Sequence, residues 1–475
     1  MISVLPVPKK IKELKKTGRC SLQITATNPE FVEGVNSFKQ IAKQVYGKDL
    51  VYGDKGIVVK KDCTLNPDGY KIKTENVRVT IKARTSEGLL YAFATLLQIV
   101  KLKNDRLNYP ICEIEDYPDC SYRGLMVDVA RQHHDIKELL GYVNICFLYK
   151  IKYLHIHFID DQAYTLPSRV LENISSDNHY TFEEIKMLVN YAHERNVRIV
   201  PEIESIGHAI CFLDKYPEIF EFKPIDGKAY DGFSINGVAK RNNVVCAGSL
   251  EVRNYMKRFI DEIIDMFPYS EYIHLGGDEA SIPALDTCSV CADYMKKHNL
   301  SSSHELFGEY LGELASYVLK KGKTPVVWEG FSKEIAHFIP KRTLVIAWES
   351  YYNYSYDLIK DGFNIINCSW KPLYVTPYYY WGIKEIKGWN VYSWRHWWKQ
   401  SKAYGKGIDI SKTDKVLGGQ LCSWECNYAQ EYEKIKSNLI ALSERTWNNK
   451  DEIPAFSGKT KRLYQLVSVL NGDDN

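Results

Sequence analysis

The chain has 475 residues, enough for two or three domains or for one small domain joined to a barrel-sized one. Its hydrophobic content of 45% and charged content of 25% are ordinary for a globular protein, and a net charge of +3 argues against nucleic acid or an anionic membrane as a partner. The aromatic content of 13%, with 34 Tyr and 10 Trp, is high. Because aromatic faces stack on sugar rings, this composition favours a carbohydrate ligand.

The N-terminal segment carries no apolar signal core, and no run of about 18 apolar residues predicts a membrane span. Most of the twelve cysteines stand singly in apolar segments, which suits a reducing compartment better than a disulfide framework. We therefore expect a cytoplasmic protein, although a secreted protein whose signal had been removed would show the same features. The sequence leaves the oligomeric state open, with a homodimer among the alternatives.

Residues 1–115 are predicted to form a small α+β domain. Alternating or apolar runs indicate strands, and helical spacing indicates two helices, the second of them capped by Thr85. The expected strands are 21–26, 56–60, 69–74 and 77–83, and the expected helices are 31–46 and 88–100. Nothing in this domain suggests catalysis, and the turn at 116–119 leads into the next domain.

Residues 116–475 show a repeated strand-then-helix pattern that predicts a catalytic (β/α)8 TIM barrel. The expected strands are 124–129, 153–158, 197–202, 272–276, 324–328, 343–348, 363–367 and 416–422. The expected helices are 136–149, 181–196, 250–267, 304–321, 355–361 and 431–447. An open doubly wound sheet is the alternative, but it would need a glycine-rich phosphate turn after its first strand, and 124–128 is not one.

Acidic residues and tryptophans gather at the predicted carboxyl ends of the strands, where TIM barrels carry their chemistry. They are Asp128 with Arg131, Asp160-Asp161, the segment 202–208, Asp278-Glu279, Trp328-Glu329, Trp348-Glu349, the segment 368–374 and Trp424-Glu425. In 272–280 an apolar strand runs into two glycines and then into the carboxylates of Asp278 and Glu279. Two carboxylates beside tryptophan-rich walls indicate acid/base chemistry on a sugar.

These motifs resemble glycoside hydrolase family 20, the exo-acting β-N-acetylhexosaminidases. The resemblance follows nearly the whole chain in order and is carried by the segments 5–10, 87–98, 122–131, 155–162, 201–208 and 274–279. Its most specific part is His274-Leu275-Gly276-Gly277-Asp278-Glu279. The resemblance implies a small α+β domain on a catalytic barrel. It also implies a retaining hydrolase that needs no metal or cofactor and acts on glycans ending in β-linked GlcNAc or GalNAc.

The resemblance also implies a mechanism in which the 2-acetamido oxygen of the substrate, not a side chain, attacks the anomeric carbon and forms an oxazolinium ion. Glu279 would be the general acid and later the base, and Asp278 would orient the acetamido N–H and stabilise the developing charge. Residues adjacent in sequence tend to point in different directions, which disfavours this pair as the acid and nucleophile of an ordinary retaining enzyme.

Supporting roles are implied for further residues. Arg123 would bind the 3- and 4-hydroxyls of the sugar, and Asp160, preferred here to Asp161, would act with His208 to orient the acid. Trp328, Trp348 and Trp424 would form the walls, Tyr374 would bind the acetamido oxygen, and Glu425 would stand near the 4- or 6-hydroxyl. The chain departs from the family pattern at Ile206, where proline is usual, and at Glu425, which directly follows Trp424. Acceptance of both the GlcNAc and GalNAc configurations therefore stays open.

Two other functions fit the same sequence. One is a family 20 enzyme specialised for a 6-sulfated sugar or for a disaccharide such as lacto-N-biose, and the other is a carbohydrate-binding protein on an inactive barrel. Cys288 and Cys291 have the spacing of metal ligands, but no second CxxC or His pair completes a zinc site. The alternative is that Cys288 and Cys291 are free thiols or form a local disulfide. The segment resembles a cysteine-bearing insertion of the family, and we assign it no chemistry.

Overall fold

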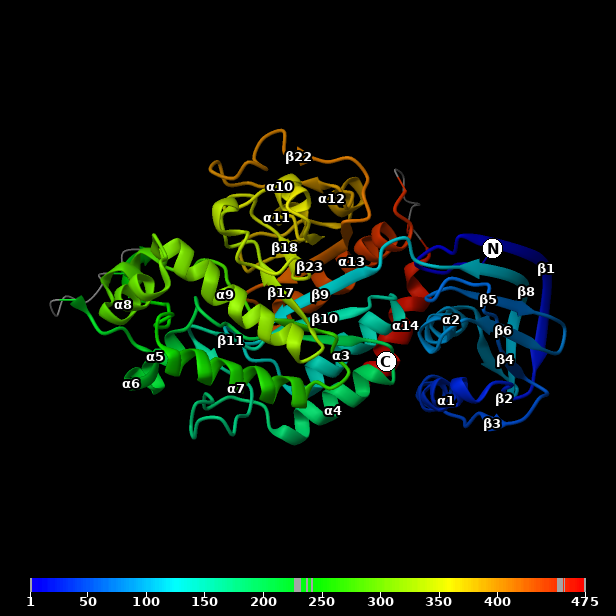
Figure 1. Ribbon diagram of the computed structural model, residues 1–475. Helices are drawn as coiled ribbons and strands as arrows, with labels where there is room; N and C mark the ends of the chain where they lie inside the picture. The colour runs from blue at the N-terminus through cyan, green and yellow to red at the C-terminus, as the bar shows by residue number, and fades with distance from the viewer. Residues whose placement is uncertain are drawn as a thin grey trace.

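The computed structural model describes residues 2–225, 232–235, 238–240, 242–450, 456 and 458–473, with backbone alone for the two short pieces between 232 and 240. Two sheet-based units follow each other along the chain (Figure 1). The first is an α+β unit drawn in blue, and the second is a closed parallel barrel surrounded by helices. Among the described residues, no helix is long and apolar enough to cross a membrane.

The N-terminal unit contains an eight-stranded sheet with the order β1-β8-β5-β6-β4-β2-β3 and β7 beside β8. Its strands are β1 Lys10–Cys20, β2 Gln23–Ala26, β3 Val51–Tyr52, β4 Ile57–Lys61, β5 Tyr70–Thr74, β6 Val79–Ala83, β7 Lys101–Lys103 and β8 Arg106–Asp116. Its helices are η1 Pro29–Phe31, α1 Val32–Tyr46 and α2 Ser86–Ile99, the last capped by the Thr85 side chain. β1 escaped prediction because it is an edge strand, and its first eight residues are exposed and mostly charged or polar.

The second unit is a closed barrel of eight parallel strands, which confirms the predicted TIM fold. The strands are β9 Tyr122–Asp128, β10 Tyr153–His157, β13 Arg198–Glu202, β16 Tyr272–His274, β17 Thr324–Trp328, β18 Leu344–Ala347, β19 Asn364–Asn367 and β23 Val416–Ser423. Each pairs with the next in that order, and β23 closes the ring by pairing with both β19 and β9. All eight correspond to strands expected from the sequence.

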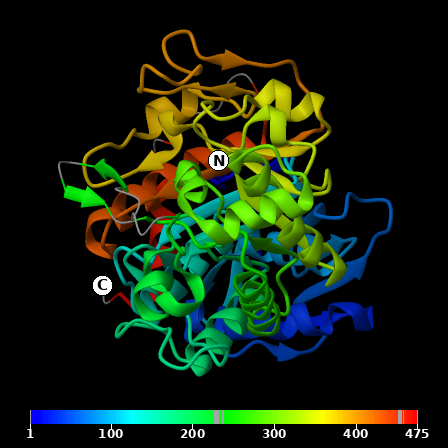
Figure 2. The same ribbon diagram turned by 60° about the vertical axis from the view of Figure 1, so that its left-hand side comes forward.

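Helices between the strands form the outer layer of the barrel (Figures 1 and 2). They are α3 Ile136–Leu148, α4 Phe182–His193, α7 Leu250–Met266, α9 Ser303–Lys320, α10 Ser355–Lys360 and α13 Tyr428–Trp447. Three begin with a reciprocal capping box, in which a side chain before the helix and one in its first turn each bond the other's backbone N–H: Asp135 with Glu138, Thr181 with Glu184, and Asn427 with Gln430.

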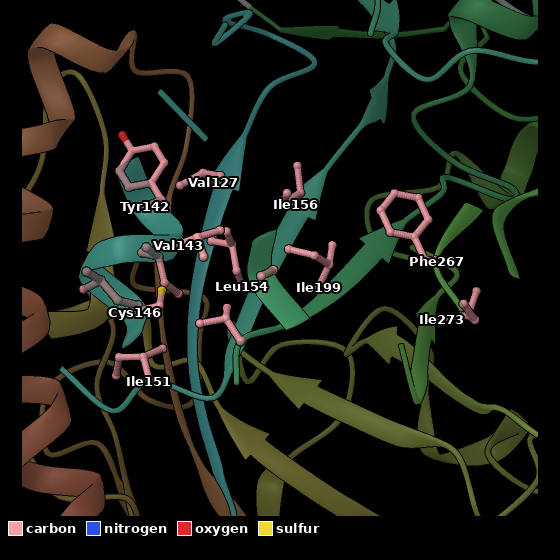
Figure 3. Close-up of a cluster of buried hydrophobic side chains, with 14 of the residues drawn as sticks. Val127, Tyr142, Val143, Cys146, Ile151, Leu154, Ile156, Ile199, Phe267 and Ile273 are labelled. Atoms are coloured by element: carbon pink, nitrogen blue, oxygen red, sulfur yellow. The ribbon is translucent and has the colours of Figure 1, made fainter. Parts of the chain in front are cut away.

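Strand residues alternate between two cores. In β9, Tyr122 and Met126 face the barrel interior, whereas Leu125 and Val127 belong to the layer between strands and helices. Figure 3 shows this outer layer, with Val127 of β9 and Leu154 of β10 near Val143 and Cys146 of α3. This alternation decides which residues of a strand can reach the barrel interior.

The remaining elements lie in the connections or at the end of the chain. They are β11 Ile159–Asp160, β12 Ala163–Tyr164, α5 Ile210–Lys215, α6 Pro217–Phe220, β14 Gly232–Ile235, β15 Val238–Lys240, η3 Ile282–Thr287, α8 Ser289–His298, η4 Lys333–Ile335, α11 Trp370–Leu373, β20 Tyr374–Val375, α12 Ile383–Gly388, β21 Ser393–Trp394, β22 Ile408–Asp409 and α14 Thr460–Asn471. α14, drawn in red, packs against α3 of the barrel and against α1 and α2 of the first unit (Figure 1). The C-terminal helix thereby joins the two units.

Candidate active site

A cavity of about 180 Å³ opens among the residues that follow the carboxyl ends of the barrel strands. Acidic, basic and aromatic side chains line it: Arg131, His157, Asp160, His208, Asp278, Glu279, Trp328, Trp348, Trp370, Tyr374, Thr376, Trp424 and Glu425. All nine candidate residues predicted from the sequence other than Arg123 are in this set, so the structure brings them together.

The turn after β16 delivers both carboxylates to the cavity. Gly276 and Gly277 have φ of +66° and +98°, and a Cβ at Gly276 would lie 2.0 Å from a carboxylate oxygen of Glu204, so only glycine fits there. Asp278 is 11% exposed by its side chain, whereas Glu279, itself at φ +45°, is 52% exposed at the mouth. An oxygen of each carboxylate lies within 4.8 Å of the other and of a His208 nitrogen.

His208 bridges the acidic groups of the cavity. Its Nδ1 lies 3.3 Å from Oδ1 of Asp160, and its Nε2 lies 3.5 Å from Oε2 of Glu279 and 4.0 Å from Oδ2 of Asp278. Asp160 is also paired with Arg131 at 2.6 Å and with Nε2 of His157 at 2.8 Å. The site is therefore an alternating array of opposite charges.

The array sets the protonation of its members. Burial alone would lower the pKa of His208, but the Asp160 carboxylate and hydrogen bonds to Asp160, Asp161 and Glu279 raise it well above its usual value. Burial alone would raise the pKa of Asp160, yet His208 and Arg131 hold it well below the ordinary range. Glu279 behaves in the same way, because the hydrogen bond and charge of His208 outweigh burial and lower its pKa. His208 is therefore a cation beside a Glu279 carboxylate in the ligand-free protein.

Asp278 has the opposite environment. Burial, together with the charges of Glu279 and Glu202 and despite His208, raises the pKa of Asp278 to about 6. Its Oδ1 is buried without a hydrogen-bond partner, as is Nε1 of Trp424 in the same cavity. An unpaired buried acceptor and donor are costly unless a ligand completes them.

Four tryptophans and a tyrosine wall the cavity. Trp328 donates its indole N–H to Glu202, and Trp348 donates to the Glu329 carbonyl at 2.9 Å, so hydrogen bonds fix both rings. Trp370 stacks on Tyr374 at a centroid distance of 4.7 Å, and Trp424 lies 5.7 Å from Trp328. Rigid aromatic faces around buried carboxylates are suited to one sugar ring.

Two acids at strand ends do not line the cavity. Glu329 is fully buried and accepts the backbone N–H groups of Ser350, Tyr351 and two further residues, so it holds the loop after β18 in place. Burial, with the nearby charges of Glu279, Glu329 and Asp278, raises the pKa of Glu349 to about 9. Glu349 is therefore uncharged at neutral pH.

Comparison with known proteins agrees with this arrangement. The sequence model of the family "Glycosyl hydrolase family 20, catalytic domain" matches residues 120–450, and the model of "Glycosyl hydrolase family 20, domain 2" matches residues 1–117. The chain belongs to glycosyl hydrolase family 20. This confirms the resemblance drawn from the sequence.

Two curated β-hexosaminidases are similar to this chain in sequence. A β-hexosaminidase of Porphyromonas gingivalis is 27% identical over 420 residues, covering 81% of this chain and 51% of the relative, and one of Akkermansia muciniphila is 29% identical, covering 75% and 73%. The chain thus spans about half the length of the first. A crystal structure of an exo-β-N-acetylglucosaminidase from Vibrio harveyi has the same fold, with a TM-score of 0.84, 22% identity, and coverage of 99% of this chain and 77% of that one.

In this family 20 chain the arginine at the cavity is Arg131, and the prediction for Arg123 is wrong. Arg131 follows the end of β9, pairs with Asp128 at 3.2 Å and with Asp160, and lies over the Trp424 ring. Arg123 is the second residue of β9, at the opposite end of the barrel. The strand alternation also places it on the outer face with Leu125 and Val127.

Arg123 instead joins the barrel to the first unit. Its guanidinium is fully buried and donates to the Tyr91 hydroxyl at 2.7 Å and to the carbonyls of Cys120 and Lys150, and it lies 3.9 Å from Asp68. Tyr91 and Asp68 belong to the N-terminal unit. The residue is structural.

Four lining residues have no role assigned from the sequence: Arg131 and Trp370, which fall in the predicted strand-end set, and His157 and Thr376. His157 connects Glu202 to Asp160 and could have been found, because it lies within the predicted strand 153–158 on the same face as the inward-facing Tyr153. Trp370 and Thr376 follow β19 in an irregular segment that gives no periodic signal. Glu425, at φ +60°, donates its backbone N–H to Asp128 at 3.1 Å and lines the cavity.

Proposed function

We propose that this family 20 protein is an exo-acting, retaining β-N-acetylhexosaminidase that removes terminal β-linked GlcNAc or GalNAc. The observation that carries the proposal is the pair Asp278–Glu279: the Asp278 carboxylate is buried with its Oδ1 lacking a hydrogen-bond partner, and the Glu279 carboxylate stands at the mouth beside a cationic His208. The tryptophan walls and the small cavity support a single terminal sugar as the bound unit.

Glu279 is assigned the proton transfers. Its position at the mouth is where the leaving group of a terminal sugar would lie, and His208 at 3.5 Å holds a proton within reach. Glu279 protonates the glycosidic oxygen as the bond to the anomeric carbon breaks, and in the second step it takes a proton from the water that attacks that carbon.

Asp278 is assigned to the 2-acetamido group. As a carboxylate it accepts the acetamido N–H at its unpartnered Oδ1, turns the acetamido oxygen toward the anomeric carbon, and stabilises the positive charge of the oxazolinium ion. Tyr374 would bind the acetamido oxygen, while Trp328, Trp348 and Trp424 would enclose the sugar and its methyl group.

The proximity of the two carboxylates leaves one competing chemistry, in which Asp278 itself attacks the anomeric carbon. Retaining enzymes of that kind hold their carboxyl groups about 5–5.5 Å apart. The buried Oδ1 of Asp278 has no hydrogen-bond partner, which favours the orienting role, because this oxygen can accept the acetamido N–H. An Asp278 nucleophile would not need the 2-acetamido group.

Hydrolysis of N,N′-diacetylchitobiose followed by proton NMR tests the proposal. We expect release of GlcNAc whose first-formed anomer is β, the configuration of the bond that was cleaved. Glu279→Gln should lower this turnover by about 10²–10⁴-fold with unchanged folding, because a general acid contributes about that much. Release of the α anomer first, or a Glu279→Gln variant with wild-type turnover, would contradict the proposal.

The specialised alternatives have no feature of their own in the structure. A strictly disaccharide- or sulfate-specific enzyme would cleave none of the simple GlcNAc or GalNAc substrates. An inactive carbohydrate-binding barrel is disfavoured because Asp278, Glu279, His208, Asp160 and Arg131 are all in place.

A further inference from the structure

Three cysteines from distant parts of the chain meet beside the active-site loops. The Sγ of Cys246 lies 3.5 Å from that of Cys288 and 3.8 Å from that of Cys291, and all three sulfurs lie within 4.8 Å of one another. All three side chains are buried. Cys246 precedes α7, whereas Cys288 and Cys291 stand at the start of α8, just after the loop that carries Asp278 and Glu279.

The spacing of the sulfurs is that of a metal site. Zn–S bonds of about 2.3 Å in a tetrahedron place neighbouring sulfurs about 3.8 Å apart, whereas a disulfide requires about 2.0 Å. Another buried pair, Cys368 and Cys422, has its sulfurs 2.9 Å apart inside the barrel. Among the described residues, no third metal-binding side chain joins this pair. The three-cysteine cluster is therefore distinct from an accidental pair of buried thiols.

The backbone beside Cys288 favours a thiolate at that residue. Cys288 is the N-cap of the ten-residue helix α8, where the helix dipole favours a negative charge. The chain also packs tightly here, since a Cβ at Gly248 would come within 2.6 Å of the Cys291 Cα.

We propose that Cys246, Cys288 and Cys291 bind one structural Zn²⁺ as thiolates, each thiol releasing its proton when the metal binds. Thiolate ligands select a soft or borderline ion such as zinc over magnesium or calcium. No fourth His, Cys, Asp or Glu joins the cluster among the described residues, so water or another small donor would complete the tetrahedron. This replaces the expectation of no metal drawn from the CxxC alone.

The zinc would fix the loops of the active site. The loop before Cys246 bonds the His208 loop on one side, with Ala209 N–H donating to the Asn243 carbonyl at 3.0 Å and Val245 N–H to the Ile206 carbonyl at 3.1 Å. On the other side, Oδ1 of Asn243 accepts the N–H of Ser281, two residues after Glu279.

Tying Cys246 to Cys288 and Cys291 therefore clamps the His208 loop against the Glu279 loop. Arg253 strengthens the clamp, because it is buried and donates to the Ala247 carbonyl at 2.8 Å. The distance from His208 to Glu279 depends on both loops, and the metal would hold it.

Metal analysis of the full chain, purified without chelator, tests the site independently of catalysis. We expect about one zinc per chain, retained on gel filtration and released when a mercurial reagent modifies the thiols. Cys288→Ser and Cys246→Ser should each lose the zinc, whereas Cys63→Ser, on the surface, and Cys146→Ala, buried in α3, should keep it.

A second measurement covers the case in which the cysteine variants fail to fold. Wild-type protein stripped of zinc and titrated with Co²⁺ should develop the charge-transfer absorption of thiolate ligation at one equivalent, and its Tm should rise with added metal. Purified protein that holds no zinc and gives no such band would overturn the proposal. So would intact-mass and peptide analysis showing a disulfide among the three cysteines. Either result leaves the assignment of hexosaminidase activity untouched.

Discussion

Nε2 of His208 lies 3.5 Å from Oε2 of Glu279, and this contact would join the proposed general acid to a proton reservoir. His208 is held cationic by Asp160, and Glu279 is held anionic by His208. We infer that the two groups share one proton and that the pair carrying this proton is the reactive state.

Replacement of His208 by Ala should shift the pH dependence of kcat/KM. In the wild type the shared proton is lost only as pH rises through the raised pKa of the pair, so the alkaline limb lies above the usual histidine value. Without His208 the proton must reside on Glu279 alone, and the alkaline limb should move to lower pH. A variant that loses activity equally at every pH would contradict this role.

Asp278→Asn should separate activity from stability. The pKa of Asp278 is raised from 3.8 in the unfolded chain to about 6 in the folded protein. Ionisation of Asp278 therefore destabilises the folded protein, and this cost grows between about pH 4 and pH 6 and is fully present above pH 6. Removing that charge should raise the free energy of unfolding at pH 7 by about 3 kcal/mol while lowering kcat by about 10²–10³-fold.

Urea unfolding of Asp278→Asn and wild type at pH 7 and pH 4 measures the first effect. The difference should shrink to below about 1 kcal/mol at the lower pH, because Asp278 is then protonated in the folded protein and about half protonated in the unfolded chain. A variant that is less stable at pH 7 would show that the buried carboxylate is stabilising.

Arg131, at the cavity, and Arg123, buried between the two units, can be compared as a test variant and its control. Arg131→Lys keeps the charge but loses the forked geometry, and we expect kcat/KM to fall about 10–100-fold, chiefly through KM, with little change in Tm. Arg123→Lys should leave KM unchanged and lower the free energy of unfolding, by up to about 3–5 kcal/mol if the buried partners are left unpaired. The opposite assignment of the two effects would restore Arg123 to the sugar site.

The Glu425→Gln variant tests whether Glu425 binds a sugar hydroxyl. Glu425 lines the cavity beside Arg131 and Trp424, so its carboxylate would accept a hydrogen bond from a sugar hydroxyl. Loss of that charge should change the ratio of kcat/KM for GlcNAc and GalNAc substrates by about threefold to tenfold, while the acetamido dependence stays the same. An unchanged ratio would place Glu425 outside the recognition of the 4- and 6-hydroxyls.

Much of the barrel was predictable because its buried parallel strands are short apolar runs bounded by polar residues, as in β17 and β23. The edge strand β1 was not predictable, because its exposed lysines hide the alternation of apolar and polar residues that marks a strand. The cavity residues after strand ends followed from the same pattern. Arg123 was misplaced because the motif around it was interpreted without asking which end and which face of β9 it occupies.

Long-range contacts lay beyond the sequence. Cys246 stands 42 residues before Cys288, so no local spacing connects it with the CxxC. The charges that Asp160, His208 and Glu279 impose on one another likewise depend on distances that only the fold sets. The domain boundary at 115/116 and the cytoplasmic location stay predictions.

The measurement that tests the central claim most directly is the release of p-nitrophenol from the β-GlcNAc, β-GalNAc and β-glucose glycosides, side by side. If the substrate's own acetamido group is the nucleophile, one or both acetamido sugars should be cleaved and the glucoside should not. Cleavage of the glucoside at a comparable rate would contradict the account, and would make Asp278 the nucleophile.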